Sequence, residues 1–176
     1  MIHKSKTTLK VVLVIMIFGL FSANSYAQIS VFGPGADTNP TAAVVTACNG
    51  SSLLTARVLV TAASTESTIA VVVDLAAGME YVPGSIAITA PLAGYTVVDN
   101  GGTANIPEFT ITKTAGVIGS GESITFTIAR SGDCTIKDNA LADPVIVPLD
   151  NVAATIGSAS ANKNSFTYSV NYASFS

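Results

Sequence analysis

Short stretches in which apolar and polar residues alternate recur along this chain, and they limit its fold more than any other feature. In the clearest, residues 122–130, every second side chain is large and apolar: Ile124, Phe126 and Ile128. A period of two places such residues on one face of a β-strand, whereas a helix needs a period of about 3.6. The same alternation is found in two earlier stretches, residues 53–61 and 68–75. Because no stretch carries a convincing helical period, the sequence predicts an all-β chain.

Turn-forming residues divide the chain between these stretches. At Pro83-Gly84, proline fixes its own φ and glycine can take a positive φ, so Val82 to Ser85 is predicted to form a tight turn. Residues 157–165 are small and polar and are expected to form a loop. About eight or nine short strands separated by such turns indicate an antiparallel β-sandwich.

The N-terminus has the layout of a secretory signal peptide. Three lysines precede the apolar run at residues 11–21, and small residues lead up to a cleavage point between Ala27 and Gln28. The apolar run is short for a membrane span, so cleavage is favoured over the alternative, an uncleaved anchor. We therefore expect a signal peptide at residues 1–27, a leading edge strand or linker at 28–40 and a sandwich domain at 41–176, with no membrane span after cleavage.

Charge and histidine content exclude several classes of function. Five basic and eleven acidic residues follow Ala27, which gives the mature chain a net charge of −6, and the basic residues are not clustered. This argues against nucleic acid and anionic membranes as partners. The only histidine, His3, lies in the leader. A mature Ser-His-Asp or Cys-His centre, or a histidine-bound zinc ion, therefore cannot be built, and we expect no enzyme activity and no cofactor.

Carboxylates remain the only candidates for chemistry. Four glutamates are expected to be solvated at strand ends or turns rather than paired for acid–base catalysis: Glu66, Glu80, Glu108 and Glu122. Weak calcium candidates follow in one polar segment and its end: Asp133, Asp138, Asp143 and Asp150. Their spacing matches no EF-hand loop, and aspartate is common in turns, so we predict no bound metal.

Two cysteines follow the leader, Cys48 and Cys134. In an exported chain an even number of cysteines favours a disulfide, with two buried free thiols as the alternative. Cys48 precedes the strand at residues 53–61, and Cys134 follows the strand at 122–130. If these strands are antiparallel neighbours, as the second and fifth strands of an immunoglobulin-like sandwich are, the two thiols meet at one end of it.

The stretch around the predicted turn resembles a known bacterial family. Leu75-Ala-Ala-Gly-Met-Glu-Tyr81-Val-Pro-Gly-Ser85 is similar to the signature of the conserved-repeat domains catalogued as domain of unknown function 11, and residues 119–126 and 48–50 resemble further parts of it. The resemblance covers roughly residues 41–172. It implies an immunoglobulin-like antiparallel β-sandwich, of about seven to nine strands, in a large secreted surface or adhesin protein without a catalytic site.

These observations together predict a non-enzymatic structural or adhesive module at the extracellular cell surface, either on its own or as the N-terminal part of a larger repeat adhesin. Its expected partners are neighbouring modules, other surface proteins or glycans. Two alternatives remain open. The chain could be a module that binds a glycan or protein through loops at one end, or a fimbrial-type subunit that assembles by strand exchange through residues 28–36 or its final strand.

Overall fold

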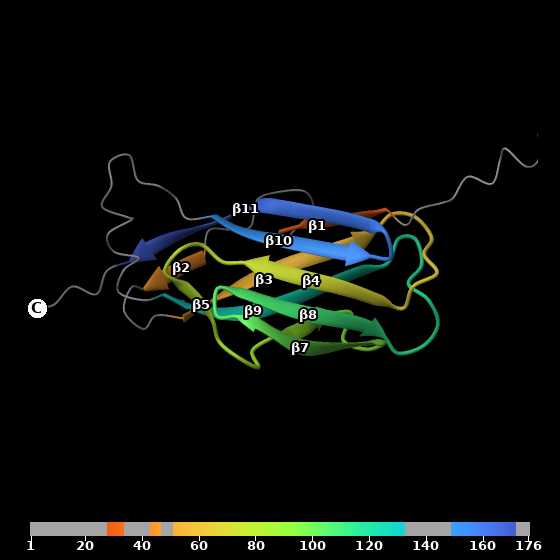
Figure 1. Cartoon of the computed structure of the whole chain (residues 1–176), viewed down its shortest axis with the longest axis horizontal. Helices are drawn as coiled ribbons and strands as arrows, with labels where there is room; N and C mark the ends of the chain where they lie inside the picture. The colour runs from red at the N-terminus through yellow and green to blue at the C-terminus, as the bar shows by residue number, and fades with distance from the viewer. Residues whose placement is uncertain (1–27, 34–42, 47–50, 133–148, 172–176) are drawn as a thin grey trace, which may run out of the picture.

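The computed structural model describes residues 28–33, 43–46, 51–132 and 149–171, which form two β-sheets packed face to face (Figure 1). The described residues contain eleven strands and no helix. The strands are β1 (Ile29–Phe32), β2 (Ala43–Thr46), β3 (Ser51–Val60), β4 (Thr68–Asp74), β5 (Met79–Tyr81), β6 (Ala87–Ala90), β7 (Tyr95–Thr103), β8 (Ile106–Lys113), β9 (Ser123–Gly132), β10 (Leu149–Ile156) and β11 (Ala159–Asn171).

The two sheets have the arrangement expected of an immunoglobulin-like sandwich. Sheet 1 has the order β1-β3-β9-β5, with β6 also paired to β9, and sheet 2 has the order β2-β11-β10-β4-β8-β7. Neighbouring strands are antiparallel except β2 and β11, which are parallel. The predicted fold is confirmed. The structure has more strands than expected because short edge pieces, such as β5 and β6 along β9, count separately.

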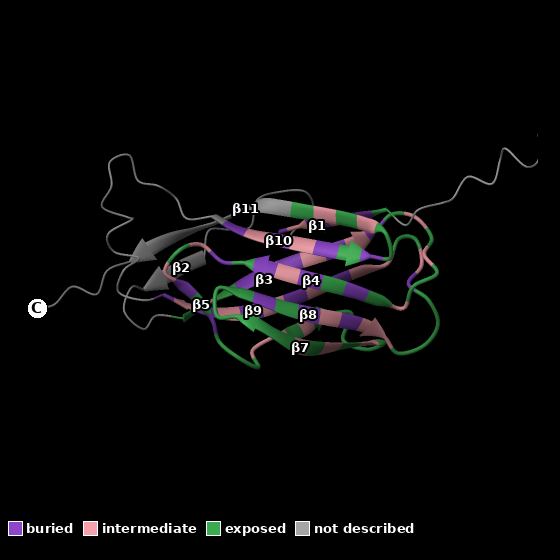
Figure 2. Ribbon diagram, viewed as in Figure 1, coloured by how far each residue is buried: buried purple, intermediate pink, exposed green. Residues whose placement is uncertain are grey.

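The apolar faces of the alternating strands form the core between the sheets (Figure 2). In β9 every second residue is buried, and the same alternation is present in β3 and β4. Sheet 1 contributes Leu54, Ala56, Val58, Val60, Ile124, Phe126 and Ile128; sheet 2 contributes Ile69, Val71, Val73, Phe109, Ile111, Val152, Ala154 and Ile156. The predicted inward faces of these strands are confirmed.

The turn at Pro83-Gly84 connects β5 to β6 as predicted. The Ser85 N–H donates to the Val82 carbonyl oxygen at 3.2 Å, and Gly84 has a φ of 75°. Proline followed by a glycine with positive φ is typical of a type II turn. Tyr81, just before the turn, is buried and packs edge to face against Phe109, with 5.3 Å between ring centroids. The turn therefore keeps both short strands on the same edge of β9.

The prediction of a loop at residues 157–165 is wrong. Only Gly157-Ser158 forms the turn, and β11 begins at Ala159. Residues Ala159 to Asn162 are small or polar and have weak strand preference, but β10 provides a ladder to which they pair. Tertiary pairing overrides local preference here. The β10–β11 ladder has a register shift between Asp150 and Val152.

Strands β3 and β9 are antiparallel neighbours, as the positions of the cysteines suggested. Their ladder runs from Leu59 opposite Ser123 to Ser51 opposite Ser131. Cys48 and Cys134 lie outside the described residues. Cys48 comes three residues before Ser51, and Cys134 comes three residues after Ser131. The cysteines are thus equally spaced in sequence from the end of one ladder, and their disulfide stays a prediction.

We expect these cysteines to form a disulfide in the oxidised protein. Closing a loop of about 85 residues would stabilise the fold by about 4 kcal/mol in the chain-entropy model. Thiol labelling of the unfolded, unreduced protein should detect no free thiol, and reduction should lower the urea midpoint. The Cys48→Ser/Cys134→Ser double variant is the control, because reductant should no longer change its stability. Two titratable thiols in the unreduced chain would contradict the prediction.

Candidate functional site

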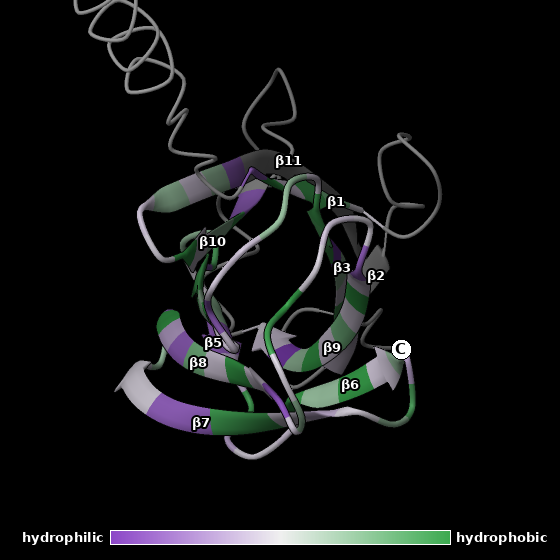
Figure 3. Ribbon diagram, turned by 90° about the vertical axis from the view of Figure 1, so that its right-hand side faces the viewer, coloured by the Kyte–Doolittle hydropathy of each residue, from purple (hydrophilic) through white to green (hydrophobic). Residues whose placement is uncertain are grey.

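Four connections lie together at one end of the sandwich, which we call the loop end. They are residues 61–67, 91–94, 114–122 and 157–158, which follow β3, β6, β8 and β10. These connections are at the right of Figure 1, and Figure 3 looks onto them. Of the two ends, this is the one whose loops the structure describes completely.

Backbone hydrogen bonds hold the connections of the loop end to one another. The Ile118 N–H donates to the Glu66 carbonyl at 2.8 Å, and the Thr114 N–H donates to the Gly94 carbonyl at 3.0 Å. The Ile118 side chain is fully buried and closes the core between the sheets. Three of the four connections are therefore joined by bonds that do not depend on side-chain identity, which makes this end a preformed surface.

A charged cluster lies beneath these loops. The Lys113 ammonium forms an ion pair with Glu122, whose other carboxylate oxygen accepts a hydrogen bond from the Tyr95 hydroxyl. Lys113 also donates to the Val117 carbonyl at 2.9 Å. Burial alone would raise the pKa of Glu122, but the bonds from Lys113 and Tyr95 outweigh it and lower that pKa. Burial and the bond to Glu122 raise the pKa of Tyr95.

This cluster is poorly suited to proton transfer at neutral pH. Glu122 is held in its ionised form, and both of its carboxylate oxygens are already bonded. A general base needs a pKa near the working pH and a free lone pair aimed at substrate. The cluster therefore acts as a brace between β7, β8 and the start of β9.

The exposed tips of the loop end are aliphatic. Leu92 is 87% exposed and Val117 is 49% exposed, on connections that neighbour each other through the Thr114–Gly94 bond. The four connections contain no aromatic residue. The loop end is thus small and polar apart from these two exposed aliphatic side chains.

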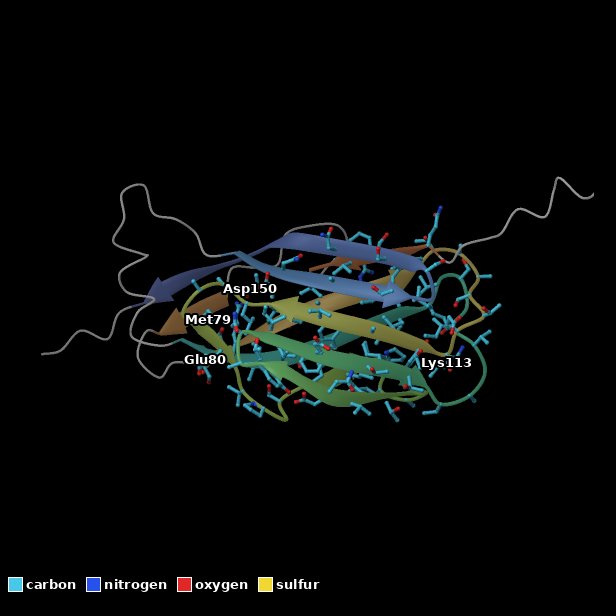
Figure 4. The ribbon with its side chains drawn as sticks, in the orientation of Figure 1. Met79, Glu80, Lys113 and Asp150 are labelled. Carbon is cyan, nitrogen blue, oxygen red and sulfur yellow. The ribbon has the colours of Figure 1, made fainter. Side chains whose placement is uncertain are left out.

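The opposite end of the sandwich contains a buried ion pair between the two sheets. Arg130 of β9 pairs with Asp150 of β10, and both side chains are buried. Arg130 Nε donates to Ser52 Oγ at 3.1 Å, while Asp150 Oδ1 accepts from the Ala76 N–H at 2.8 Å. Figure 4 shows Asp150 at the end opposite to Lys113. The pair connects sheet 1, sheet 2 and the β4–β5 connection at a single point.

A third polar contact spans the open side between β5 and β7. The Tyr81 hydroxyl donates to Asp99 Oδ2 at 2.7 Å and accepts from the Gly84 N–H at 3.0 Å. The bond from Tyr81 lowers the pKa of Asp99, and burial together with that bond raises the pKa of Tyr81. The stretch from Leu75 to Ser85 thus has an architectural role, since Tyr81 fixes the turn to the neighbouring sheet.

Several predicted site residues lie outside the described residues: Cys48, Cys134, Ala27, Asp133, Asp138 and Asp143. Gln28 is exposed, and its carbonyl accepts from the Thr61 N–H at 2.8 Å. Asp150 is not a free calcium ligand because its carboxylate is used in the ion pair. Within the described ranges no cluster of three or more His, Cys, Asp or Glu side chains could hold a metal ion. The same ranges contain no helix able to cross a membrane.

Comparison with known proteins gives similarity of backbone shape only. No protein-family model matches the chain, and no curated protein matches it. The pilus backbone RrgB of Streptococcus pneumoniae is similar at 13% identity, over 76% of this chain and 32% of that chain, with a TM-score of 0.47. The chain thus spans about a third of that pilus protein.

Two further solved structures are similar at low identity. A cohesin module of a Clostridium perfringens family 33 glycoside hydrolase is 11% identical over 85% of this chain and 99% of that chain, with a TM-score of 0.44. The collagen-binding subdomain of the Enterococcus faecalis surface protein ACE is 8% identical over 82% of this chain and 95% of that chain, with a TM-score of 0.42.

Breaking the buried ion pair should destabilise the fold strongly. Asp150→Asn leaves the Arg130 charge buried without a counter-charge, which should cost about 3–5 kcal/mol in urea unfolding. The Arg130→Met/Asp150→Asn double variant should cost clearly less, because the uncompensated charge is gone. As a control, Lys113→Met removes a partly exposed pair and should cost about 1 kcal/mol or less. Equal losses for the single and double variants would contradict this account.

The polar contacts also predict how stability depends on pH. Asp99 and Glu122 have pKa values lowered from 3.8 and 4.5, so their contribution is complete above about pH 4.5 and is lost as the pH falls through the lowered values. The pKa of Tyr95 is raised from 10.0, so its contribution is complete below pH 10 and is lost as the pH rises further.

Urea midpoints measured across this pH range test the assignment. Asp99→Asn and Glu122→Gln should lose less stability than the unsubstituted protein on acidification, and Tyr95→Phe should lose less in alkali. Parallel pH profiles for all four proteins would show that these groups are not linked to folding.

Proposed function

We propose that this chain is a non-enzymatic adhesive and structural module of an exported cell-surface protein, and that it contacts a protein partner through the loop end. The observation that carries the proposal is the pair of exposed aliphatic tips, Leu92 and Val117, on connections fixed by backbone hydrogen bonds. A preformed surface loses little conformational entropy on binding, so even a small apolar patch can contribute to affinity.

Adhesion is favoured over catalysis by the use of the polar side chains. Glu122 is bonded to both Lys113 and Tyr95, and Asp150 is paired with Arg130 inside the sandwich. Each of these groups stabilises the fold, and the only histidine of the chain is His3 in the leader. The leader supports export, and the resemblance of the Leu75 to Ser85 stretch to conserved-repeat domains supports a place in a larger repeat adhesin.

A protein partner is favoured over a glycan because of the chemistry of the exposed tips. Sugar rings are commonly bound by stacking on aromatic side chains, and the four connections contain none. Strand exchange through the first strand is less favoured, because β1 pairs with β3 of its own chain and buries Ile29 and Val31 in the core.

Binding by residues 28–176 displayed on beads tests the proposal. The beads would be exposed to a panel of immobilised extracellular proteins and, separately, to a glycan array. Leu92→Glu/Val117→Glu should weaken binding to the protein surfaces by about tenfold or more, since it places charge in the apolar patch. Leu53→Glu is the matched control, because Leu53 is 60% exposed on β3, away from the loop end.

The outcomes separate the alternatives. Binding that is lost in the loop-end variant and kept in the control supports the proposal. Binding to glycans alone would favour the glycan-binding alternative. Binding that survives the loop-end substitutions, or retention no greater than on uncoated surfaces, would overturn the loop end as the adhesive site. A melting temperature for each variant shows that the fold is intact.

A further inference from the structure

The edges of the two sheets differ in how open they are. β1 and β2 are four residues long, and the other edge of sheet 1 is divided between three-residue β5 and four-residue β6. β7, in contrast, is nine residues long and ends the order of sheet 2. Among the described strands its backbone ladder is with β8 alone, and Figure 1 shows it at the lower margin of the sandwich.

The backbone groups at this edge can be assigned from the ladder. The Thr114 N–H donates to the Gly94 carbonyl, so Gly94 and Thr114 form a hydrogen-bonded pair. Because such pairs alternate in an antiparallel ladder, Thr96 and Val98 direct their N–H and C=O groups to β8. Tyr95, Val97 and Asp99 direct theirs away from it. These outward groups form a template for another strand.

From Tyr95 to Val98, this edge lacks the features that usually prevent pairing. Natural edge strands are protected by lysine, proline, short length or a bulge. The stretch Tyr-Thr-Val-Val-Asp at residues 95–99 contains neither lysine nor proline, and the bulge of β7 comes only after it, between Asp99 and Gly101. Val98 is 55% exposed beside this open edge. Of the described strands that end a sheet order, β7 is the longest.

We propose that β7 pairs antiparallel with β7 of a second copy of this chain, about a two-fold axis at Val97, and so joins two copies of sheet 2 into one continuous sheet. In this register Val97 faces Val97 of the second copy, and the Tyr95 of each copy faces the Asp99 of the other, which makes three pairs. These three pairs consist only of residues whose backbone groups point outward, and they would exchange about six hydrogen bonds. Thr96 and Val98 face each other across the junction, which covers the exposed valine.

Charge favours this antiparallel arrangement of two copies. Asp99 and the exposed Glu108 lie toward the same end of the β7–β8 hairpin. A parallel in-register pair would place the two Asp99 residues about 5 Å apart, whereas the antiparallel pair separates them by about 14 Å. The larger distance exceeds the screening length of about 8 Å at physiological salt. Self-pairing therefore places Val97 opposite Val97 and keeps the acidic ends apart.

A contact of five residues per copy is small, so the dimer should be weak. Interfaces below about 1,200 Å² are characteristic of transient complexes. We expect dissociation at low micromolar concentration and association toward about 1 mM. The loop end takes no part in the contact, so this proposal does not depend on the proposed adhesive function.

Sedimentation equilibrium of residues 28–176 and of three variants tests the pairing. Val98→Lys should raise the dissociation constant about tenfold or more, because two like charges then flank the junction. Thr96→Glu/Val98→Lys should restore association, since each glutamate faces a lysine of the other copy. Thr155→Lys adds the same charge at an exposed position of central strand β10 and should leave association unchanged.

Amide exchange provides the second measurement. Rising protein concentration should slow exchange at the outward amides of Val97 and Asp99, and should leave Thr96 and Val98 unchanged. A chain that remains monomeric at about 1 mM would overturn the proposal. So would a dimer that is unaffected by Val98→Lys, weakened equally by Thr155→Lys, or not restored by the charge pair.

Discussion

The packing of two apolar sheet faces against each other determines where the other features of this molecule can lie. The core strands each bury one face against the other sheet, so neither sheet would be stable without the other covering it. Once the faces meet, polar side chains that point inward must find partners there. Arg130 and Asp150 do so at one end of the core, and Tyr81 and Asp99 do so along its open side. Chemistry exposed to other molecules is left to the loops and the strand edges.

Much of this architecture could be predicted from local pattern. Strands with strict alternation, such as β4 and β9, were predicted with the correct buried face, because a shift of one residue would expose the whole apolar set. The adjacency of β3 and β9 followed from the positions of the two cysteines. The Pro83-Gly84 turn was predictable because its conformation depends on those two residues.

The remaining features depend on contacts between distant residues. The start of β11 was missed because Ala159 to Asn162 form a strand only in the presence of β10. The ion pair had a detectable signal in the sequence. Arg130 lies on the same inward face of its strand as Ile128, and Asp150 lies on the same inward face as Val152. Opposite charges at core-facing positions of two strands predict a buried ion pair. The loop end had no such signal, since its bonds join backbone groups of separate connections.

The order of strands in sheet 2 has a consequence for folding kinetics. Its central pair joins β4 to β10, with Asp74 opposite Asn151. Sheet 2 therefore cannot be completed until a strand from near the end of the chain pairs with β4. Sheet 1 likewise joins β3 to β9. Such a high contact order predicts slow folding, in the range of milliseconds to seconds. Until β10 and β11 are present, sheet 2 is incomplete, because β4 lacks its neighbour on one side.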